Sequence, residues 1–269
     1  MLMSTKANRF AHLLLKARAS GSLIAPLSKA ENLGQDDAYA VAKCLMDFRI
    51  AQGEVPLGRK ISISQQQEMP IWAPLFDTSV QFAQENVALH SLTKAQQPRL
   101  APVLVFKLGR TPSANCTLTE LADCLEWMAH GFEIMVSPYR GWEFEQADAI
   151  AAFGLHRALV VGEPRMLSAQ TRRNLDEVVA CASVSVSCGT KGNSALCAAG
   201  FGSDLPASPL HALWQLHQQL QQQNSFTVLQ AGELITTGSW TEALPVKRGE
   251  VWSSAFSQIS LPGLHVSFS

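Results

Sequence analysis

The 269-residue sequence lacks the residue patterns that mark several large classes of proteins. Its six cysteines are scattered, with no CxxC pair and no cysteine–histidine cluster at zinc spacing, which excludes the common zinc modules and predicts buried, reduced thiols. No GxGxxG motif and no P-loop lysine motif occurs, so no pattern indicates a bound nucleotide. The near-terminal run Leu13-Leu14-Leu15 is too short for a signal sequence or a membrane span. We therefore expect a cytoplasmic protein.

Charged residues are also scarce. They make up 16% of the chain, against roughly 25% in an average soluble domain, which suggests that part of the surface is a subunit interface and predicts a homo-oligomer. Lysine plus arginine number 21 and aspartate plus glutamate 22, for a net charge of −1. This balance gives no electrostatic reason to expect nucleic acid or an anionic membrane as a partner.

The 47% of apolar residues are arranged as helices followed by many strands. Apolar periodicity predicts helices over residues 4–19, 35–52, 118–130 and 208–223. Alternating or β-branched segments predict strands near residues 55–64, 100–106, 155–162 and 175–187, and residues 65–78 read as a proline-rich loop. This order is typical of the α+β class. With no internal repeat, we expect one domain over residues 1–269, with a helical N-terminal lobe (1–53) and a β-rich remainder (54–269).

The segment QPRLAPVLVFK at residues 97–107 reads as a strand buried on both faces. After Arg99 it is apolar as far as Phe106, and it carries no carboxylate. It would be an unremarked core strand without the motifs around it.

Four motifs occur in order along the chain: GRKISIS (58–64), PLFD (74–77), QPR (97–99) and LQAGELITTGS (229–239). With IAPLSKAENLGQDDAYAVAKCL (24–45) and SPLHALWQLHQQL (208–220), they cover nearly the whole chain. The set resembles the 2-keto-4-pentenoate hydratase and 4-oxalocrotonate decarboxylase branch of the fumarylacetoacetate hydrolase superfamily. The resemblance implies a mixed β-roll of the superfamily's C-terminal-domain type with flanking helices, and a small 2-oxo acid as substrate, bound through Mg²⁺ or Mn²⁺.

Two residues match catalytic positions in this resemblance. Lys60 matches the family lysine that assists acid–base steps, and the alternative is a solvated lysine on an edge strand. Asp77 matches an acid that orients water or substrate, and the alternative is a turn-capping aspartate.

The metal site that the resemblance implies is incomplete. Glu133 matches the third metal-binding glutamate, but the positions of the other two are occupied by Ala101 and Val103. Neither can bind a hard cation, and one carboxylate is insufficient for tight Mg²⁺ or Mn²⁺ binding by the protein alone. We therefore assign no cofactor, and only weak metal binding, completed by the substrate, is compatible with these residues.

Six further residues are candidates for substrate binding. Arg157 could replace the cation as a carboxylate anchor, while the hydroxyl and backbone groups of the 236–238 turn match a family contact to the substrate carboxylate. Outward-facing strand residues, a solvent ion pair and a hairpin glycine are the alternatives. The six are Arg99, Arg140, His156, Arg157, Thr237 and Gly238.

Three functional hypotheses follow. The first is a hydratase or decarboxylase-like lyase of aromatic meta-cleavage type that acts on a small 2-oxo or 2-hydroxydienoic acid with a degenerate metal site. The second is a catalytically silent relative that serves as a binding or partner subunit. The third is a metal-independent tautomerase or isomerase that uses Lys60 and His156.

Overall fold

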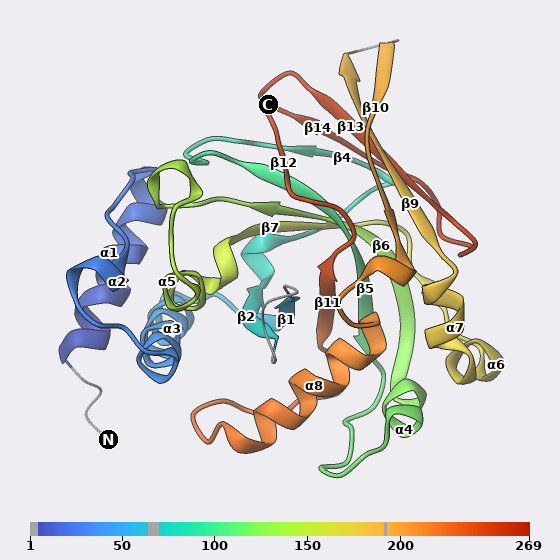
Figure 1. The fold of residues 1–269 in the computed structure, drawn as a ribbon, viewed down its shortest axis with the longest axis horizontal. Helices are drawn as coiled ribbons and strands as arrows, with labels where there is room; N and C mark the ends of the chain where they lie inside the picture. Colours follow the sequence, from blue (N-terminus) through green and yellow to red (C-terminus); the bar gives the residue numbers. More distant parts are fainter. Residues whose placement is uncertain (1–4, 64–69, 191–192) are drawn as a thin grey trace.

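Two β-sheets organise residues 5–63, 70–190 and 193–269, which are the residues that the computed structural model describes (Figure 1). The larger sheet runs β2-β1-β11-β5-β6-β7-β3, with β12 paired to β5 and β8 to β6. Its strands are β1 Pro56–Ser62, β2 Ile71–Phe76, β3 Val80–Phe82, β5 Arg99–Leu108, β6 Leu125–Met135, β7 His156–Val161, β8 Arg165–Met166, β11 Leu234–Ser239 and β12 Leu244–Pro245.

This larger sheet curls until its two ends approach one another (Figure 1). Buried side chains from five of its strands form one apolar cluster, and Val80 of β3 packs against it. Since β2 and β3 stand at opposite ends of the strand order, such a cluster requires the sheet to close around it. The cluster consists of Leu75, Val103, Val105, Trp127, Ala129, Leu159, Val161 and Leu234. We call the space that it fills the curl interior.

The smaller sheet covers part of the outer face of the curl. Its order is β10-β9-β13-β14-β4, with bounds β4 Val87–His90, β9 Ser183–Thr190, β10 Asn193–Phe201, β13 Val251–Ser257 and β14 Leu264–Phe268. Leu100, Phe132 and Val160 point outward from the curled sheet and pack against this sheet, for example against Trp252 and Val266. Strands β5, β6 and β7 are therefore buried on both faces, which explains their almost continuous apolar sequence.

Helices cover the rest of the outer face (Figure 1). They are α1 Thr5–Ser20, α2 Leu27–Ala30, α3 Gln35–Ala51, α4 Leu118–Asp123, α5 Gln146–Ala151, α6 Ala169–Arg173, α7 Leu175–Ala180 and α8 Pro209–Gln222. Helix α8 begins as its sequence predicts, because the Ser208 hydroxyl accepts a hydrogen bond from the His211 amide and Pro209 stands at the first helical position. No helix within the described ranges is long and apolar enough to cross a membrane.

The α+β class is confirmed, and three of the predicted elements are wrong. Residues 118–130 are not one helix, because α4 ends at Asp123 and β6 begins at Leu125. Residues 175–187 are not one strand, because they form α7 and then the start of β9. Of the loop predicted over 65–78, residues 65–69 lie outside the described ranges and 71–76 form β2. At residues 125–130 strand pairing overrides local periodicity, since a strand buried on both faces resembles a buried helix in sequence. Residues 175–180 form a helix because the buried Leu175 and Val179 are four positions apart, on one helix face.

The expectation of buried cysteines holds only in part. Cys44, Cys116 and Cys124 are buried, and Cys188 is half-buried. Cys181 and Cys197 are exposed, so the expectation is wrong for these two.

Candidate functional site

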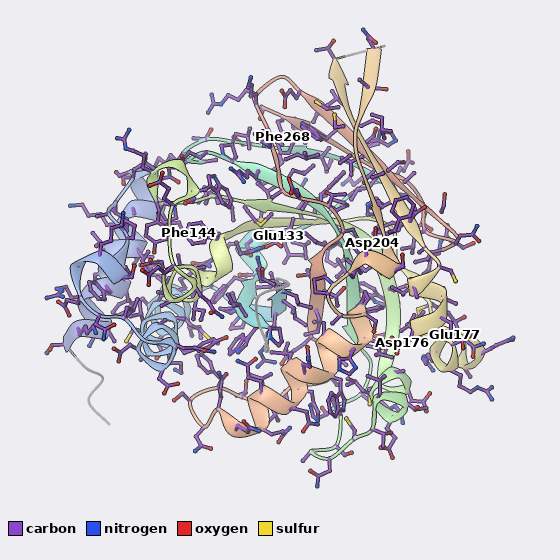
Figure 2. The ribbon with its side chains drawn as sticks, viewed as in Figure 1. Glu133, Phe144, Asp176, Glu177, Asp204 and Phe268 are labelled. Atoms are coloured by element: carbon purple, nitrogen blue, oxygen red, sulfur yellow. The ribbon has the colours of Figure 1, made fainter. Side chains whose placement is uncertain are left out.

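A buried ion pair lies at one end of the curl interior. The Lys60 ammonium of β1 is 2.7 Å from Oε1 of Glu133 on β6, and each side chain is only 2% exposed. Lys60 also donates a hydrogen bond of 2.8 Å to the carbonyl oxygen of Gly154. Two opposite charges withdrawn from water stabilise each other strongly only when their remaining hydrogen bonds are satisfied, as they are in part here. Figure 2 labels Glu133 near the middle of the molecule.

His156 extends this pair into a chain of polar contacts. Its Nδ1 lies 3.0 Å from Oε1 of Glu133, and its Nε2 lies 3.2 Å from the Ser79 hydroxyl. Leu159 and Val161 of the same strand point into the curl interior, so strict alternation would turn His156 away from it. A β-bulge in the pairing of β6 with β7, at residue 157, shifts the alternation and directs His156 towards Glu133.

Burial and the neighbouring groups shift the pKa values of Glu133 and His156. Burial opposes ionisation of Glu133, but the nearby Lys60 charge and the His156 hydrogen bond outweigh it and hold the pKa of that carboxyl below its usual value. Burial lowers the pKa of His156 to about 4, although Glu133 favours the charged ring. At neutral pH the site therefore combines an ammonium, a carboxylate and a neutral imidazole. Because a carboxylate only accepts hydrogen bonds, we assign the imidazole proton to Nδ1.

A left-handed turn closes the site on one side. Phe153, Gly154 and Leu155 form a short helical turn with φ angles of 56°, 56° and 62°. Side chains such as those of Phe153 and Leu155 rarely adopt this backbone conformation, which costs of order 1 kcal/mol or more for each such residue. The strained turn is what presents the Gly154 carbonyl oxygen to Lys60.

One polar atom near the pair has no partner. Thr236 of β11 lies beside Lys60 in the parallel pairing of β1 with β11, and it is completely buried. Its hydroxyl makes no hydrogen bond within the described ranges. A buried hydroxyl without a partner costs about 1–3 kcal/mol, so this position is available to a polar ligand atom.

Asp77, Arg99 and Arg140, three of the residues predicted from the sequence, lie outside this cluster. Asp77 is exposed and accepts hydrogen bonds from the amides of Val55 and Thr78, which is the turn-capping alternative. The Arg99 guanidinium stacks 4.3 Å from the ring centre of Trp142. Arg140 is exposed at the edge of a different cavity.

The other predicted substrate-binding residues lie at different places in the structure. Arg157 does not meet Glu133, because it stands at the bulge and donates a hydrogen bond to the carbonyl oxygen of Thr93. Thr237 is buried, and its hydroxyl lies 3.4 Å from the Leu104 carbonyl oxygen. Gly238 has a φ of +61°, as the glycine alternative for this turn requires. Of the predicted set, the structure brings together Lys60, Glu133 and His156.

Comparison with known proteins identifies the relatives of this chain. A 4-oxalocrotonate decarboxylase of a Pseudomonas species is 28% identical over 251 residues, which cover 91% of each chain. A 2-keto-4-pentenoate hydratase of Paraburkholderia xenovorans is 28% identical over 248 residues, or 89% of this chain and 87% of the relative. The chain is a relative of these hydratases and decarboxylases. The family resemblance stated from the motifs is thereby confirmed, although no family model matches the chain.

The same relationship appears in the fold. The 4-oxalocrotonate decarboxylase of Pseudomonas putida G7, solved with magnesium and adipate, superposes with a TM-score of 0.86 at 19% identity and covers 100% of this chain. A Yersinia pestis protein described as a fumarylacetoacetate hydrolase family member gives a TM-score of 0.56 over 80% of the chain. The predicted superfamily fold is therefore confirmed.

The donor atoms of this chain do not fit a divalent metal at the corresponding place. The side chains of Ala101 and Val103 offer no oxygen, and Oε1 of Glu133 is already engaged by Lys60 and His156. Mg²⁺ and Mn²⁺ sites use several oxygen ligands, usually with carboxylates among them. Within the described ranges, no group of three or more histidine, cysteine, aspartate or glutamate side chains is placed to hold an ion.

Sequence reasoning overlooked Ser79, a small hydroxyl residue two positions after Asp77, and it named Thr236 only as part of the 236–238 turn. Only the three-dimensional pairing shows that they border Lys60 and His156.

Proposed function

We propose that this chain is a hydratase or decarboxylase-like lyase for a small 2-oxo or 2-hydroxydienoic acid, and that it works without a resident divalent metal. The observation that carries the proposal is the contact of Lys60 and His156 with one carboxylate, Glu133, inside the curl. Its relatives are named for reactions on such acids, and the chain aligns with nine-tenths of their length.

The three side chains supply the groups that enol chemistry needs. Interconversion of an enol and a 2-oxo acid moves a proton between oxygen and carbon, so it requires a base and an acid within reach of the substrate. Glu133 is an ionised carboxylate and can accept a proton. Lys60 carries an ammonium next to it, which can donate a proton or stabilise the negative oxygen of an enolate. His156 donates its Nδ1 hydrogen to the carboxylate and holds it in place, and the Ser79 hydroxyl lies at Nε2 and fixes the ring.

Access to the pair requires a movement of the turn at residues 153–155. With both side chains 2% exposed, the pair cannot meet a substrate in the conformation described. Phe153 and Leu155 line a small cavity, while Gly154 between them binds Lys60. The turn therefore separates Lys60 from that cavity, and its backbone strain favours a change of conformation there.

A second function is favoured by the packing of the curl interior. A Cβ atom added at Gly131 would lie 2.7 Å from Val105 and 3.0 Å from Val103, so these side chains fill the space beside Glu133. A catalytically silent binding or partner subunit needs no space for a substrate beside Glu133, so an interior filled by valines fits that function. The two candidates differ in whether the buried pair ever meets a substrate.

Proton exchange at a 2-oxo acid separates them. The protein would be dialysed against EDTA and incubated in D₂O with a 2-oxo acid, and deuterium at C3 would be followed by NMR. The lyase proposal, like a metal-independent tautomerase, predicts exchange that resists EDTA, and hydration of 2-hydroxypenta-2,4-dienoate distinguishes the lyase from the tautomerase. Absence of both reactions would favour the silent subunit.

A further inference from the structure

Arg18 of α1 is a cation without a carboxylate partner. Its terminal nitrogens donate hydrogen bonds of 2.9 and 3.1 Å to the carbonyl oxygens of His156 and Arg157. Within the described ranges, its Nε makes no hydrogen bond and the side chain forms no ion pair. Two carbonyl oxygens satisfy part of the guanidinium but do not neutralise it.

Nearby positive charges leave the guanidinium charge of Arg18 still less compensated. Burial, together with the charges of Arg49 and Arg157, lowers the pKa of Arg18 to about 9. Among the residues that the structure describes, the one acid that acts against this shift is Glu54, which is already bound by Arg49 through two hydrogen bonds. Three guanidinium groups thus share one carboxylate. A partly buried positive charge in this condition is stabilised by any anion that can reach it.

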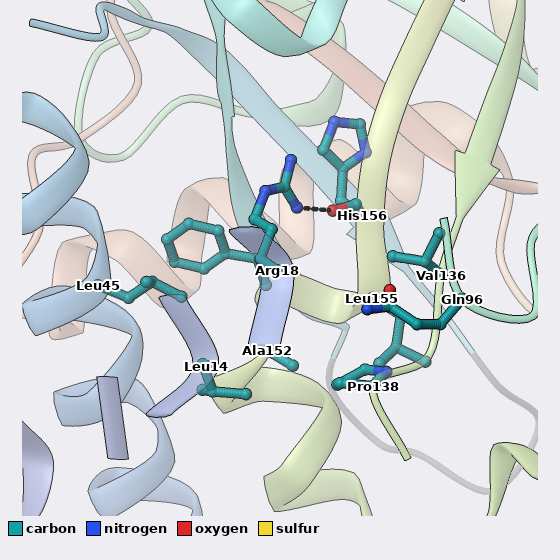
Figure 3. A pocket seen from close by; sticks show the side chains of 10 residues that line it. Leu14, Arg18, Leu45, Gln96, Val136, Pro138, Ala152, Leu155 and His156 are labelled. Atoms are coloured by element: carbon teal, nitrogen blue, oxygen red, sulfur yellow. Dashed lines mark hydrogen bonds between the residues drawn. The ribbon is translucent and has the colours of Figure 1, made fainter. Parts of the chain in front are cut away.

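A cavity gives an anion that access. It has a volume of about 40 Å³ and is partly open. Apart from Arg18, Gln96 and His156 its lining is apolar, and it consists of Leu14, Leu45, Val136, Pro138, Ala152, Phe153 and Leu155. Figure 3 shows Arg18 between these apolar side chains and the strand that begins at His156. Because a single water needs roughly 10–15 Å³ measured in this way, the space holds about three non-hydrogen atoms, the size of a carboxylate, and its open part leaves room for a short apolar end.

We propose that this cavity binds a short-chain monocarboxylate, with its carboxylate on Arg18 and its apolar end against Leu14, Leu45 and Ala152. Arg18 can offer its remaining N–H groups to the carboxylate oxygens, as guanidinium groups do in carboxylate recognition. The apolar lining of the cavity favours binding of a hydrocarbon end of the ligand over binding of a second charged group. The site lies on the far side of the 153–155 turn from Lys60, and its existence does not depend on the proposed lyase activity.

Saturation-transfer NMR with propionate tests the proposal directly. The full chain is titrated with propionate, and with propionamide as the uncharged molecule of the same shape. We expect saturation of the propionate methyl group in the wild-type protein and about tenfold or greater weakening for propionamide. Equal binding of the two molecules, or binding of neither by the folded wild-type protein, would overturn the assignment.

Three variants locate the binding. Arg18→Gln removes the charge, and Ala152→Leu fills the cavity while leaving Arg18 in place; each is expected to raise the Kd of propionate about tenfold or more. Lys16→Gln, on an exposed position of the same helix, is the matched control and should leave the Kd unchanged. Circular dichroism establishes that each variant is folded. Should Arg18→Gln fail to fold, Ala152→Leu decides alone, and undiminished binding by that variant would refute the site.

Discussion

Ala101 stands directly opposite Glu133 in the antiparallel pairing of β5 with β6. A methyl group therefore faces the carboxylate across the two strands, at one of the positions where the family resemblance places a metal-binding glutamate. Glu133 turns instead to Lys60, 2.7 Å away, and the charge of the carboxylate is balanced by a side chain of the same protein. The consequences of this exchange can be measured in stability as well as in activity.

The buried pair should make Lys60 difficult to replace. Lys60→Met leaves the Glu133 charge buried without a partner, and we expect the free energy of unfolding to fall by about 3–5 kcal/mol. Lys107→Met removes one partner of the half-exposed Lys107–Glu126 pair and should cost less than about 1 kcal/mol. Urea denaturation of both variants makes the comparison.

A double variant controls for lost packing. Lys60→Met combined with Glu133→Leu removes both charges and should recover most of the stability lost in Lys60→Met alone. If the double variant is as unstable as the sum of its single variants, Glu133 and Lys60 are not coupled as described.

Stability should fall on mild acidification. Burial lowers the pKa of His156 and the pKa of His130 to about 4. Between about pH 6.5 and pH 4 these two histidines are therefore protonated in the unfolded chain and neutral in the folded chain. The free energy of unfolding then decreases as the pH falls through this window, by about 2 kcal/mol per histidine between pH 7 and pH 5. His156→Gln should lose the part of this decrease that one histidine contributes, about 2 kcal/mol between pH 7 and pH 5, and His211→Gln, at an exposed position, is the matched control. An unchanged slope in His156→Gln would show that this histidine is not held neutral.

Substitution of Gly131 tests whether side chains fill the curl interior. Gly131→Ala would bring a Cβ atom within 2.7 Å of Val105, and we expect a loss of about 1–3 kcal/mol in the free energy of unfolding. Val105→Ala in the same chain makes room, so the combined loss should be smaller than the sum of the two. Gly109→Ala, at an exposed position where the added Cβ atom would lie 3.1 Å from the Cβ atom of Glu126, is the matched control and should cost less than Gly131→Ala. Additive losses would mean that the space beside Glu133 is not filled by these valines.

Much of the fold could be predicted from the sequence, because local signals agree with it. The cap and proline of α8 and the periodicity of α1 and α3 appear in the structure as predicted. The boundary between α4 and β6 could not, since Leu125 to Met135 is apolar on both faces and only its pairing with β5 and β7 makes it a strand. The single-domain organisation, the homo-oligomer and the cellular location stay predictions.

The candidate site was predictable only where one residue carried the signal. The family resemblance singled out Glu133, and the structure places this residue at the centre of the cluster. The choice of His156 over Arg157 was not predictable, because it depends on a β-bulge that changes which side chain points inward. Arg18 was missed because its partners are backbone carbonyl groups 138 and 139 residues away.

The central claim is that Lys60 and Glu133 perform acid–base chemistry on a 2-oxo acid without a divalent metal. The most direct test measures hydration of 2-hydroxypenta-2,4-dienoate by metal-stripped protein in EDTA, for the wild type and for the Lys60→Met/Glu133→Leu double variant, both shown to be folded. We predict turnover by the wild type that added Mg²⁺ does not increase, and none by the double variant. Turnover that appears only when Mg²⁺ is added, or that survives in the double variant, would contradict the claim.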